Sequence, residues 1–465
     1  MNRALPLHLL TLATAAGCVL GLMHIACTIG LHVPFDPNEG WNAYFTQAAM
    51  TTGSPYPPAQ SAMVDNYPPL SFYIVGLVAK LAGDAVVAGR IVALAAFIAL
   101  AAGIEACART MGANRIEAVF AALFFSAGLM LTSDYVGMDD PQMLGHAIAI
   151  GGLWLVLREP RQPRDMVGAA ALFAIAFFVK HNLVVLPLAV AIWLALLDRR
   201  LATTFAGSGA IFGLVGLGMF KQVFGFSLLS VIASPRSYDA ASIWMSLRDW
   251  LMWSAIPLAG AAALFAAARR DAQAMFCVIY AAVATLAGIY FLGGAGVDAN
   301  ALFDADIALA LCAALLLNRM PAWSSAVALL YAVPLAAGLW SLDAPWQTSA
   351  FWLRPMSDER VAADAQIALL KASPGPAICE MLSLCYWAGK PAGFDVFNME
   401  QAYITKVRSD AALVRDIQVR RYGIVQLEEL DPFPLTPAAH RALTANYRIV
   451  RQDDDRTFFA PNSVP

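Results

Sequence analysis

Long apolar runs recur along most of this chain, and they constrain its fold more than any other feature. A helix that crosses a lipid bilayer needs roughly 20 mostly apolar residues. Hydrophobic side chains make up 60% of the 465 residues and charged ones only 14%. A single soluble core could not bury so much apolar surface, so the sequence predicts a polytopic α-helical membrane protein.

Eleven of these runs are predicted to cross the membrane. The first follows a single cation, Arg3, and is too long for the core of a cleaved signal peptide, so we expect it to be retained as a helix. The predicted spans lie at residues 5–31, 88–107, 117–133, 142–157, 166–179, 183–197, 203–220, 250–268, 273–292, 304–317 and 322–340.

The stretch PPLSFYIVGLVAKLAGD, at residues 68–84, decides the orientation of everything after it. Its apolar run of about a dozen residues before Lys80 suits a juxtamembrane helix better than a crossing. If it does not cross, eleven cations lie on the side of the N-terminus and six on the other, which makes the N-terminal side cytoplasmic. The eleven are Arg3, Arg109, Arg115, Arg158, Arg161, Arg164, Arg199, Arg200, Arg269, Arg270 and Arg319, and the six are Lys80, Arg90, Lys180, Lys221, Arg236 and Arg248.

Two domains are therefore expected. Residues 1–343 form a transmembrane domain whose first outer loop covers residues 32–87, and residues 344–465 form a small soluble α/β domain outside the cytoplasm. Strand-like runs in the second domain include PAICEML, YGIVQL and the pair YRIV and RTFFA. It also holds Cys379 and Cys385, which form either a disulfide or two free thiols.

Polar residues gather at the outer ends of the predicted spans. Ionisable groups there are costly unless they face a water-filled cavity or a partner, so their concentration at one level indicates function. The outer-face set comprises Asp36, Glu39, Asn42, Tyr44, Asp65, Asn66, Tyr67, Asp134, Asp139, Asp140, Lys180, His181, Asn182, Arg236, Asp239, Asp298, Asn300, Asp304 and Asp306. Any one of these acids, taken alone, is equally explained as a solvated loop residue.

The acidic motifs DPNEG and MDDPQ, taken together, suit glycosyl transfer. A carboxylate can accept the proton of an acceptor hydroxyl or amine as that group attacks an anomeric carbon. Lys180, His181 or Arg236 could stabilise the departing phosphate, or a divalent ion such as Mg or Mn held by carboxylates could do so. Lys180 is also explained as a snorkelling cation and His181 as a structural residue, and no His or Cys spacing predicts zinc.

Five motifs in this order resemble the GT-C superfamily of membrane glycosyltransferases. They are DPNEGWNAY, NYPPLSFY, AGR ending at Arg90, MDDPQ and FVKHN. The similarity covers most of residues 1–320 and is nearest to the bacterial family 39 and family 87 types, which are related to protein O-mannosyltransferases and to the lipid A aminoarabinose transferase. An outer C-terminal domain is also common in such enzymes.

The resemblance implies a polyprenyl-phosphate-linked sugar donor and transfer at the outer face of a bacterial cytoplasmic membrane, with membrane lipids around the enzyme. Relatives usually carry an adjacent Asp-Glu pair in the first loop, where this chain has Asn38-Glu39 with Asp36 two residues earlier. Either Glu39 or Asp36 is then the base, with Glu39 favoured, or the activity differs from that of the relatives. The acceptor is a lipid, a glycan or a protein, and nothing in the charge pattern predicts nucleic acid.

The resemblance also assigns the second acidic motif to Asp139 and Asp140, with Asp140 preferred because a Pro follows it. These residues orient the acceptor, support the first carboxylate or bind a divalent ion. NYPPL opens the juxtamembrane helix. The expected substrate-binding residues are Asn66, Tyr67, Lys180, His181, Arg236 and Asn300, with Lys180 and Arg236 contacting the lipid phosphate.

Two other functions fit the same features. A transporter or flippase for lipid-linked sugars would also need a polar cavity at the end of apolar helices, although such proteins more often show internal repeats and midplane polar residues. A non-catalytic binding protein is consistent with the missing Asp-Glu pair. Loss of function in Glu39→Gln would separate an enzyme from a binding protein.

Overall fold

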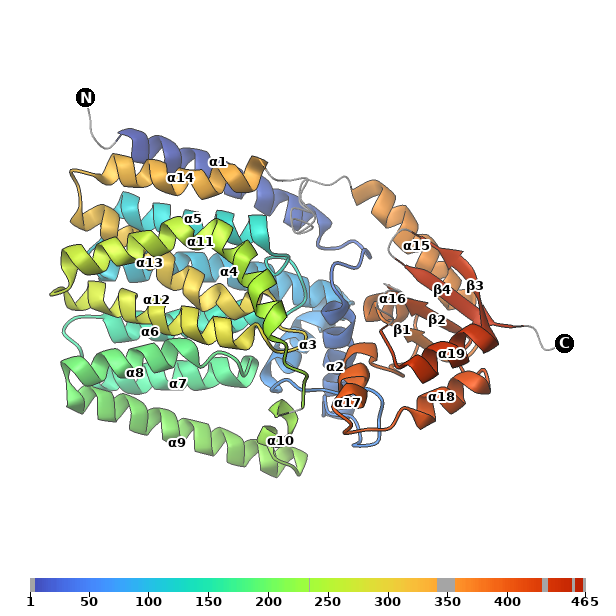
Figure 1. The fold of residues 1–465 in the computed structure, drawn as a ribbon. Helices are drawn as coiled ribbons and strands as arrows, with labels where there is room; N and C mark the ends of the chain where they lie inside the picture. The colour runs from blue at the N-terminus through green and yellow to red at the C-terminus, as the bar shows by residue number, and fades with distance from the viewer. Residues whose placement is uncertain (1–4, 234, 341–355, 429–433, 454–455, 463–465) are drawn as a thin grey trace.

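The computed structural model describes residues 5–233, 235–340, 356–428, 434–453 and 456–462. A bundle of helices lies at one end of the molecule and a small domain that contains a β-sheet lies at the other (Figure 1). The predicted domain boundary at residues 343 and 344 falls outside the described residues.

Most helices of the bundle run side by side (Figure 1). In the described part of the chain, seven helical segments are long and apolar enough to cross a membrane, the last of them formed by a short 3-10 turn and the helix after it. They are α1 (Leu5–Thr28), α4 (Ala85–Thr110), α5 (Arg115–Thr132), α9 (Arg199–Phe224), α11 (Ala240–Ala268), α12 (Ala272–Phe291) and η1 (Ala299–Leu302) with α13 (Phe303–Arg319).

The other four predicted spans are also helices, but they have only 13 to 17 residues. They are α6 (Gln142–Leu157), α7 (Pro163–Val179), α8 (Val185–Leu197) and α14 (Ser324–Trp340), and a five-residue helix, α10 (Leu228–Ile232), follows α9. The four short spans lie alongside the long helices (Figure 1). The chain is thus a multi-pass membrane protein in which every predicted span coincides with a helix.

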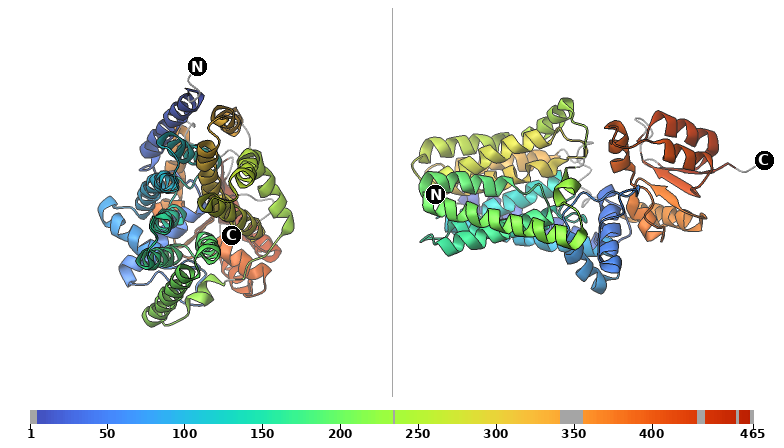
Figure 2. Two further views of the ribbon diagram at one scale, coloured as in Figure 1. Left: turned by 90° about the vertical axis from the view of Figure 1, so that its left-hand side faces the viewer. Right: turned by 90° about the horizontal axis from the view of Figure 1, so that it is seen from below.

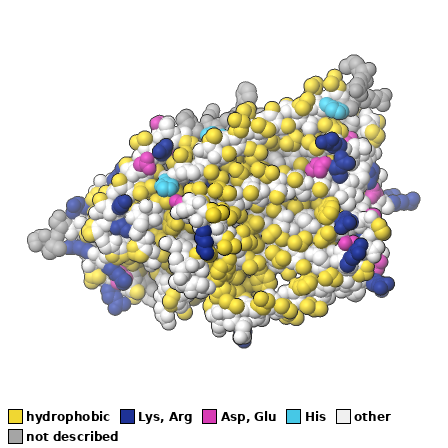
Figure 3. Space-filling view, turned by 180° about the vertical axis from the view of Figure 1, so that it is seen from behind, with side chains coloured by type: hydrophobic (Ala, Val, Ile, Leu, Met, Phe, Trp, Pro, Cys, Tyr) yellow, Lys and Arg dark blue, Asp and Glu magenta, His cyan; other side chains and the backbone are white. Residues whose placement is uncertain are grey.

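The surface of the bundle is apolar between two charged zones. Figure 3 shows hydrophobic side chains over the middle of the molecule, whereas Lys, Arg, Asp and Glu gather towards its two ends. Exposed residues of the apolar zone include Leu12, Leu20, Leu214 and Leu286, all at least 63% exposed. Lipid tails can cover such side chains, which explains why they are stable without protein partners.

Two helices of the first loop lie across the end of the bundle, between it and the C-terminal elements (Figure 2). They are α2 (Pro37–Thr52) and α3 (Leu70–Ala82). The end of α1 and the start of α4 lie at this same end, because Arg90 in α4 donates hydrogen bonds to the carbonyls of Leu31 and Val33. The chain between them therefore enters and leaves at one end of the bundle, and α3 does not cross it.

The C-terminal part contains a four-stranded mixed sheet in the order β1-β2-β4-β3. β1 pairs with β2 in parallel, and β4 is antiparallel to both β2 and β3. The strands are β1 (Ala377–Cys379), β2 (Ile424–Leu427), β3 (Tyr447–Gln452) and β4 (Thr457–Pro461), and the helices are α15 (Met356–Ala372), α16 (Leu382–Trp387), α17 (Val396–Ile404), α18 (Ala411–Gln418) and α19 (Pro437–Asn446). All four strand-like runs of the sequence are thereby confirmed as strands.

Cys379 and Cys385 form a disulfide, which decides the alternative that the sequence left open. The bond joins the end of β1 to α16, and the two cysteines are six residues apart in the sequence. The α16 backbone packs directly on α2, because a Cβ atom on Gly40 would lie 1.9 Å from the backbone nitrogen of Ser383. The C-terminal domain is therefore in close contact with the first-loop helix.

Candidate functional site

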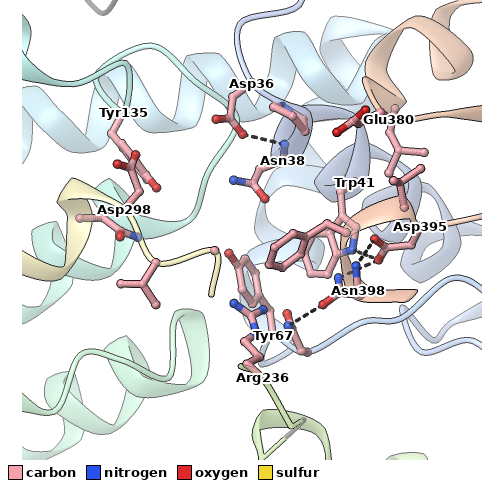
Figure 4. A pocket seen from close by; sticks show the side chains of 18 residues that line it. Asp36, Asn38, Trp41, Tyr67, Tyr135, Arg236, Asp298, Glu380, Asp395 and Asn398 are labelled. Carbon is pink, nitrogen blue, oxygen red and sulfur yellow. Dashed lines mark hydrogen bonds between the residues drawn. The ribbon is translucent and has the colours of Figure 1, made fainter. Parts of the chain in front are cut away.

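A cavity of about 330 Å³ lies where the end of the bundle meets the C-terminal domain. Its walls come from the first loop, the loop after α5, the segments on either side of α11 and α12, and the C-terminal domain (Figure 4). The lining includes Asp36, Asn38, Trp41, Asn66, Tyr67, Tyr135, Arg236, Asp298, Asn300, Glu380, Asp395, Phe397 and Asn398. The cavity thus brings together Asp36 and four other predicted site residues from distant parts of the sequence. These four are Asn66, Tyr67, Arg236 and Asn300.

Asp36 is the N-cap of α2 and lies on the cavity wall. Its Oδ1 accepts a hydrogen bond of 2.7 Å from the backbone N–H of Asn38, and Pro37 opens the helix. Burial raises the pKa of Asp36 to about 7, with a further increase from the carboxylates of Glu39 and Asp298 and an opposing effect of the Asn38 N–H. A carboxyl group with such a pKa can accept a proton near neutral pH.

Glu39 is fully buried and does not line the cavity. Its Oε1 and Oε2 each accept a 2.6 Å hydrogen bond from the guanidinium of Arg90, which is also fully buried. The backbone N–H groups of Phe35 and Asp139 donate to the same carboxylate at 3.0 and 3.2 Å. Glu39 therefore ties α2 to α4 and to the loop before α6.

Asp139 and Asp140 are both buried in that loop. Asp139 contributes its backbone carbonyl, which accepts from Asn42 at 2.7 Å, and burial raises the pKa of its carboxyl well above the usual range. Both carboxylate oxygens of Asp140 accept hydrogen bonds of 2.9 Å from Nζ of Lys180. Within the described residues, no group of three or more His, Cys, Asp or Glu is arranged to hold a metal ion.

Lys180 reaches the cavity only through another side chain. It is buried at the end of α7, and its Nζ also donates to the hydroxyl of Tyr67 at 2.9 Å. Tyr67 lines the cavity, and burial raises the pKa of its phenol, so that it remains a donor. Burial and the charges of Lys180 and Arg236 lower the pKa of His181 to about 4, so this histidine is neutral near pH 7.

Arg236 brings a cationic side chain to the cavity wall. Its guanidinium donates to the carbonyl of Ala295 at 3.0 Å and lies 5.4 Å from the ring centroid of Phe397. Figure 4 shows Arg236 and Tyr67 on one side of the cavity and Asp36 on the opposite side. Asn300 and Asn66 complete the predicted set, and they donate to Gln142 at 3.3 Å and Asn398 at 3.4 Å.

Several lining residues were not selected from the sequence. Asp298 was among the outer-face acids but carried no motif that distinguished it from a solvated aspartate. Glu380, Asp395 and Asn398 lie more than 300 residues after Asp36, and nothing in the sequence indicates that they return to the first loop. The hydrogen bond of 3.0 Å from Trp41 Nε1 to Asp395 is visible only in the fold.

Part of the chain is similar in sequence to a known protein family. Residues 66–220 match the sequence model of the family described as dolichyl-phosphate-mannose-protein mannosyltransferase. This match covers about a third of the chain, and over these residues the chain is similar to that family of membrane glycosyltransferases. The resemblance that the motifs indicated is thus confirmed.

Two solved structures of one protein have a similar fold. ArnT from Cupriavidus metallidurans bound to undecaprenyl phosphate is 12% identical, with a TM-score of 0.62 over 97% of each chain. ArnT from the same organism in the apo state is 14% identical, with a TM-score of 0.61 over 96% of this chain and 98% of that one. No curated protein matches the sequence.

Proposed function

We propose that the protein transfers a sugar from a polyprenyl-phosphate-linked donor to an acceptor of the cell envelope. The reaction takes place at the outer face of a bacterial cytoplasmic membrane, with the N-terminus in the cytoplasm and the C-terminal domain outside. The lipid carrier is supported by the undecaprenyl phosphate bound to the structurally similar ArnT. The orientation is supported by the excess of cations at the other end of the bundle.

The arrangement of Asp36 and Arg236 across one cavity carries this proposal (Figure 4). The acceptor O–H gives its proton to the Asp36 carboxylate as its oxygen bonds to the anomeric carbon. The bond from that carbon to the phosphate oxygen breaks, and the phosphate leaves with the electron pair. Arg236 and Tyr67 stabilise the phosphate by donating hydrogen bonds to it.

Asp36 takes the role of base in this mechanism, although the sequence favoured Glu39. Asp36 lines the cavity, and its raised pKa suits proton transfer near neutral pH. Both oxygens of Glu39 are occupied by Arg90 and by backbone N–H groups. A base must reach the substrate proton, and this favours Asp36 over Glu39.

Lys180 and Asp140 act together behind the cavity wall in this proposal. The ammonium of Lys180 donates to the phenol oxygen of Tyr67, which leaves the phenol proton available to the departing phosphate. Asp140 balances the charge of Lys180 and keeps the pair in place. The same contact occupies the oxygens that a divalent ion would need at Asp140, so we expect EDTA to leave activity unchanged.

The direct test is transfer of radiolabelled sugar by the purified protein from a panel of undecaprenyl-phosphate-linked hexoses and pentoses, with and without EDTA. Turnover of any donor would support the proposed function. Donor binding with no consumption across neutral, phosphorylated and peptide acceptors would instead support a transporter or a binding protein.

The pH dependence of turnover is expected to have an acidic limb near pH 7. Below this value the Asp36 carboxyl is protonated and cannot accept the acceptor proton, so kcat/KM should fall about tenfold per pH unit. Above it the carboxylate is ionised and the rate should level off. A kcat/KM profile measured between about pH 5 and pH 9 checks this, and a flat profile down to about pH 5 would contradict it.

Arg236→Ala is expected to weaken binding of undecaprenyl phosphate by about tenfold or more, because a charge-assisted hydrogen bond to phosphate is lost. Titration of the detergent-solubilised protein by intrinsic tryptophan fluorescence measures this affinity. Arg248→Ala is the matched control, since Arg248 is mostly exposed on α11 and pairs with its neighbour Asp249. Equal affinities in wild type and Arg236→Ala would show that another residue contacts the phosphate.

A further inference from the structure

The C-terminal domain forms part of the cavity wall. Glu380, Leu382, Phe397 and Asn398 line it together with Asp395, which also anchors Trp41 of α2. The domain is held in this position by further contacts with the first loop, where Arg408 donates to the carbonyls of Ser61 and Ala59. An acceptor that fills this cavity beside Asp36 therefore has residues of this domain within the same walls.

Glu380 is one of two carboxylates that this domain contributes to the cavity lining, and Asp395 is the other. Figure 4 shows Glu380 and Asp36 on the same side of the cavity, opposite Arg236. Glu380 follows Cys379 of the disulfide, and its Oε2 accepts a 2.8 Å hydrogen bond from the backbone N–H of Glu428. The side chain is thus hydrogen-bonded to the residue that follows β2, while α16 packs against Gly40 of α2.

The charges around the cavity restrict the chemistry of the acceptor. Four of the residues that line the cavity have a carboxyl group. Among the described residues of the lining, Arg236 alone has a cationic side chain. The four carboxylates belong to Asp36, Asp298, Glu380 and Asp395. An anionic acceptor beside Asp36 and Glu380 would be repelled. A phosphate oxygen is also ionised already and needs no general base, whereas a hydroxyl does.

The remaining lining residues resemble those that contact carbohydrates. Asn38, Asn300 and Asn398 offer amides that both donate and accept, so they can serve several hydroxyls of one molecule. Trp41 and the exposed ring of Phe397 offer aromatic surfaces for the apolar faces of a sugar ring. A lone Ser or Thr hydroxyl of a peptide would use few of these groups.

We propose that Glu380 and the first turn of α17 form the acceptor subsite, and that the acceptor is an uncharged saccharide whose hydroxyls bind Glu380 beside Asp36. This inference rests on the proposed function and adds to it the chemical class of the acceptor. It also gives the C-terminal domain a role in acceptor selection, for which its sequence offers no signal.

The test compares wild type with Glu380→Gln in the full-length protein. Gln keeps an oxygen that can accept from Glu428, so the loop should remain folded while the carboxylate charge is lost. Asp364→Asn is the matched control, because it removes an exposed carboxylate from the same domain in α15. Each protein is given neutral oligosaccharides, the same oligosaccharides bearing a phosphate ester, and Ser/Thr peptides as acceptors.

Wild type is expected to use neutral saccharides with at least about tenfold higher kcat/KM than the phosphorylated ones. Glu380→Gln should raise the KM for the neutral acceptor about tenfold, with a change in kcat of less than about twofold. The same variant should show a smaller difference in kcat/KM between neutral and phosphorylated saccharides. Binding of undecaprenyl phosphate should stay at the wild-type level in both variants.

Three results would overturn the inference while leaving the proposed function in place. The first is preferential transfer by wild type to phosphorylated saccharides or to peptides. The second is that Glu380→Gln has the wild-type KM for the acceptor and the wild-type preference for neutral over phosphorylated saccharides. The third is a loss of undecaprenyl phosphate binding in that variant. If wild type binds no undecaprenyl phosphate and consumes no donor, the proposed function itself fails.

Discussion

Asp36→Asn is expected to lower kcat by about 10²- to 10⁴-fold, which is the range for loss of a general base. The substitution removes the proton acceptor and changes almost nothing else. Asn is as good an N-cap as Asp, so the hydrogen bond from the Asn38 N–H and the start of α2 should survive. Affinity for undecaprenyl phosphate should therefore stay close to that of wild type.

Asp198→Asn provides the matched control. Asp198 caps α9 by accepting from the N–H of Arg200, as Asp36 caps α2, but it is exposed and lies in the α8–α9 connection, outside the cavity lining. Single-turnover and steady-state transfer assays on both variants would separate a chemical effect from a capping effect. Wild-type turnover by Asp36→Asn would show that the base is elsewhere, with Asp298 as the next carboxylate in the cavity.

The sequence predicted the helices well because burial in lipid demands long uninterrupted apolar runs. The predicted span at residues 142–157 coincides with α6, and that at 273–292 differs from α12 by one residue at each end. The start of α11 was placed at residue 250 instead of Ala240. Its first turns carry Arg248 and Asp249, and a hydropathy criterion excludes these charges although a helix can include them.

The sequence predicted which residues lie near the candidate site, but not which groups their side chains contact. The predicted topology placed Asp36, Tyr67, Lys180 and Arg236 at one end of the bundle. In the structure Asp36, Tyr67 and Arg236 line one cavity, and Lys180 contacts Tyr67. Spacing along a sequence does not reveal which way a side chain points. Lys180 was expected to contact phosphate, whereas its ammonium is held by Asp140 and Tyr67.

The two acids of the first loop illustrate the same limit. Asp36 and Glu39 lie three residues apart, so both are near the start of one helix. Their environments differ because Asp36 caps the helix beside the cavity while Glu39 turns towards Arg90. The partner that decides this difference is 51 residues away from Glu39, and no local pattern identifies it.

Arg90→Met is expected to destabilise the fold by about 3–5 kcal/mol, the usual cost of breaking a buried ion pair. Both side chains of the Arg90–Glu39 pair are 0% exposed. Without the guanidinium, Glu39 would be a buried charge without compensation, and the carbonyls of Leu31 and Val33 would lose their donor. Thermal unfolding in detergent, followed by tryptophan fluorescence, measures the loss.

Arg109→Met is the control on the same helix, because Arg109 and Glu105 are 48% and 30% exposed and 3.8 Å apart. Such an exposed pair contributes about 0–1 kcal/mol, so that variant should unfold close to the wild-type temperature. The double variant Arg90→Met with Glu39→Met should recover part of the lost stability, since no charge is then left buried without a partner. If instead Arg90→Met unfolds at the wild-type temperature, the pair does not hold α2 in place, and the assignment of Glu39 as a structural residue is wrong.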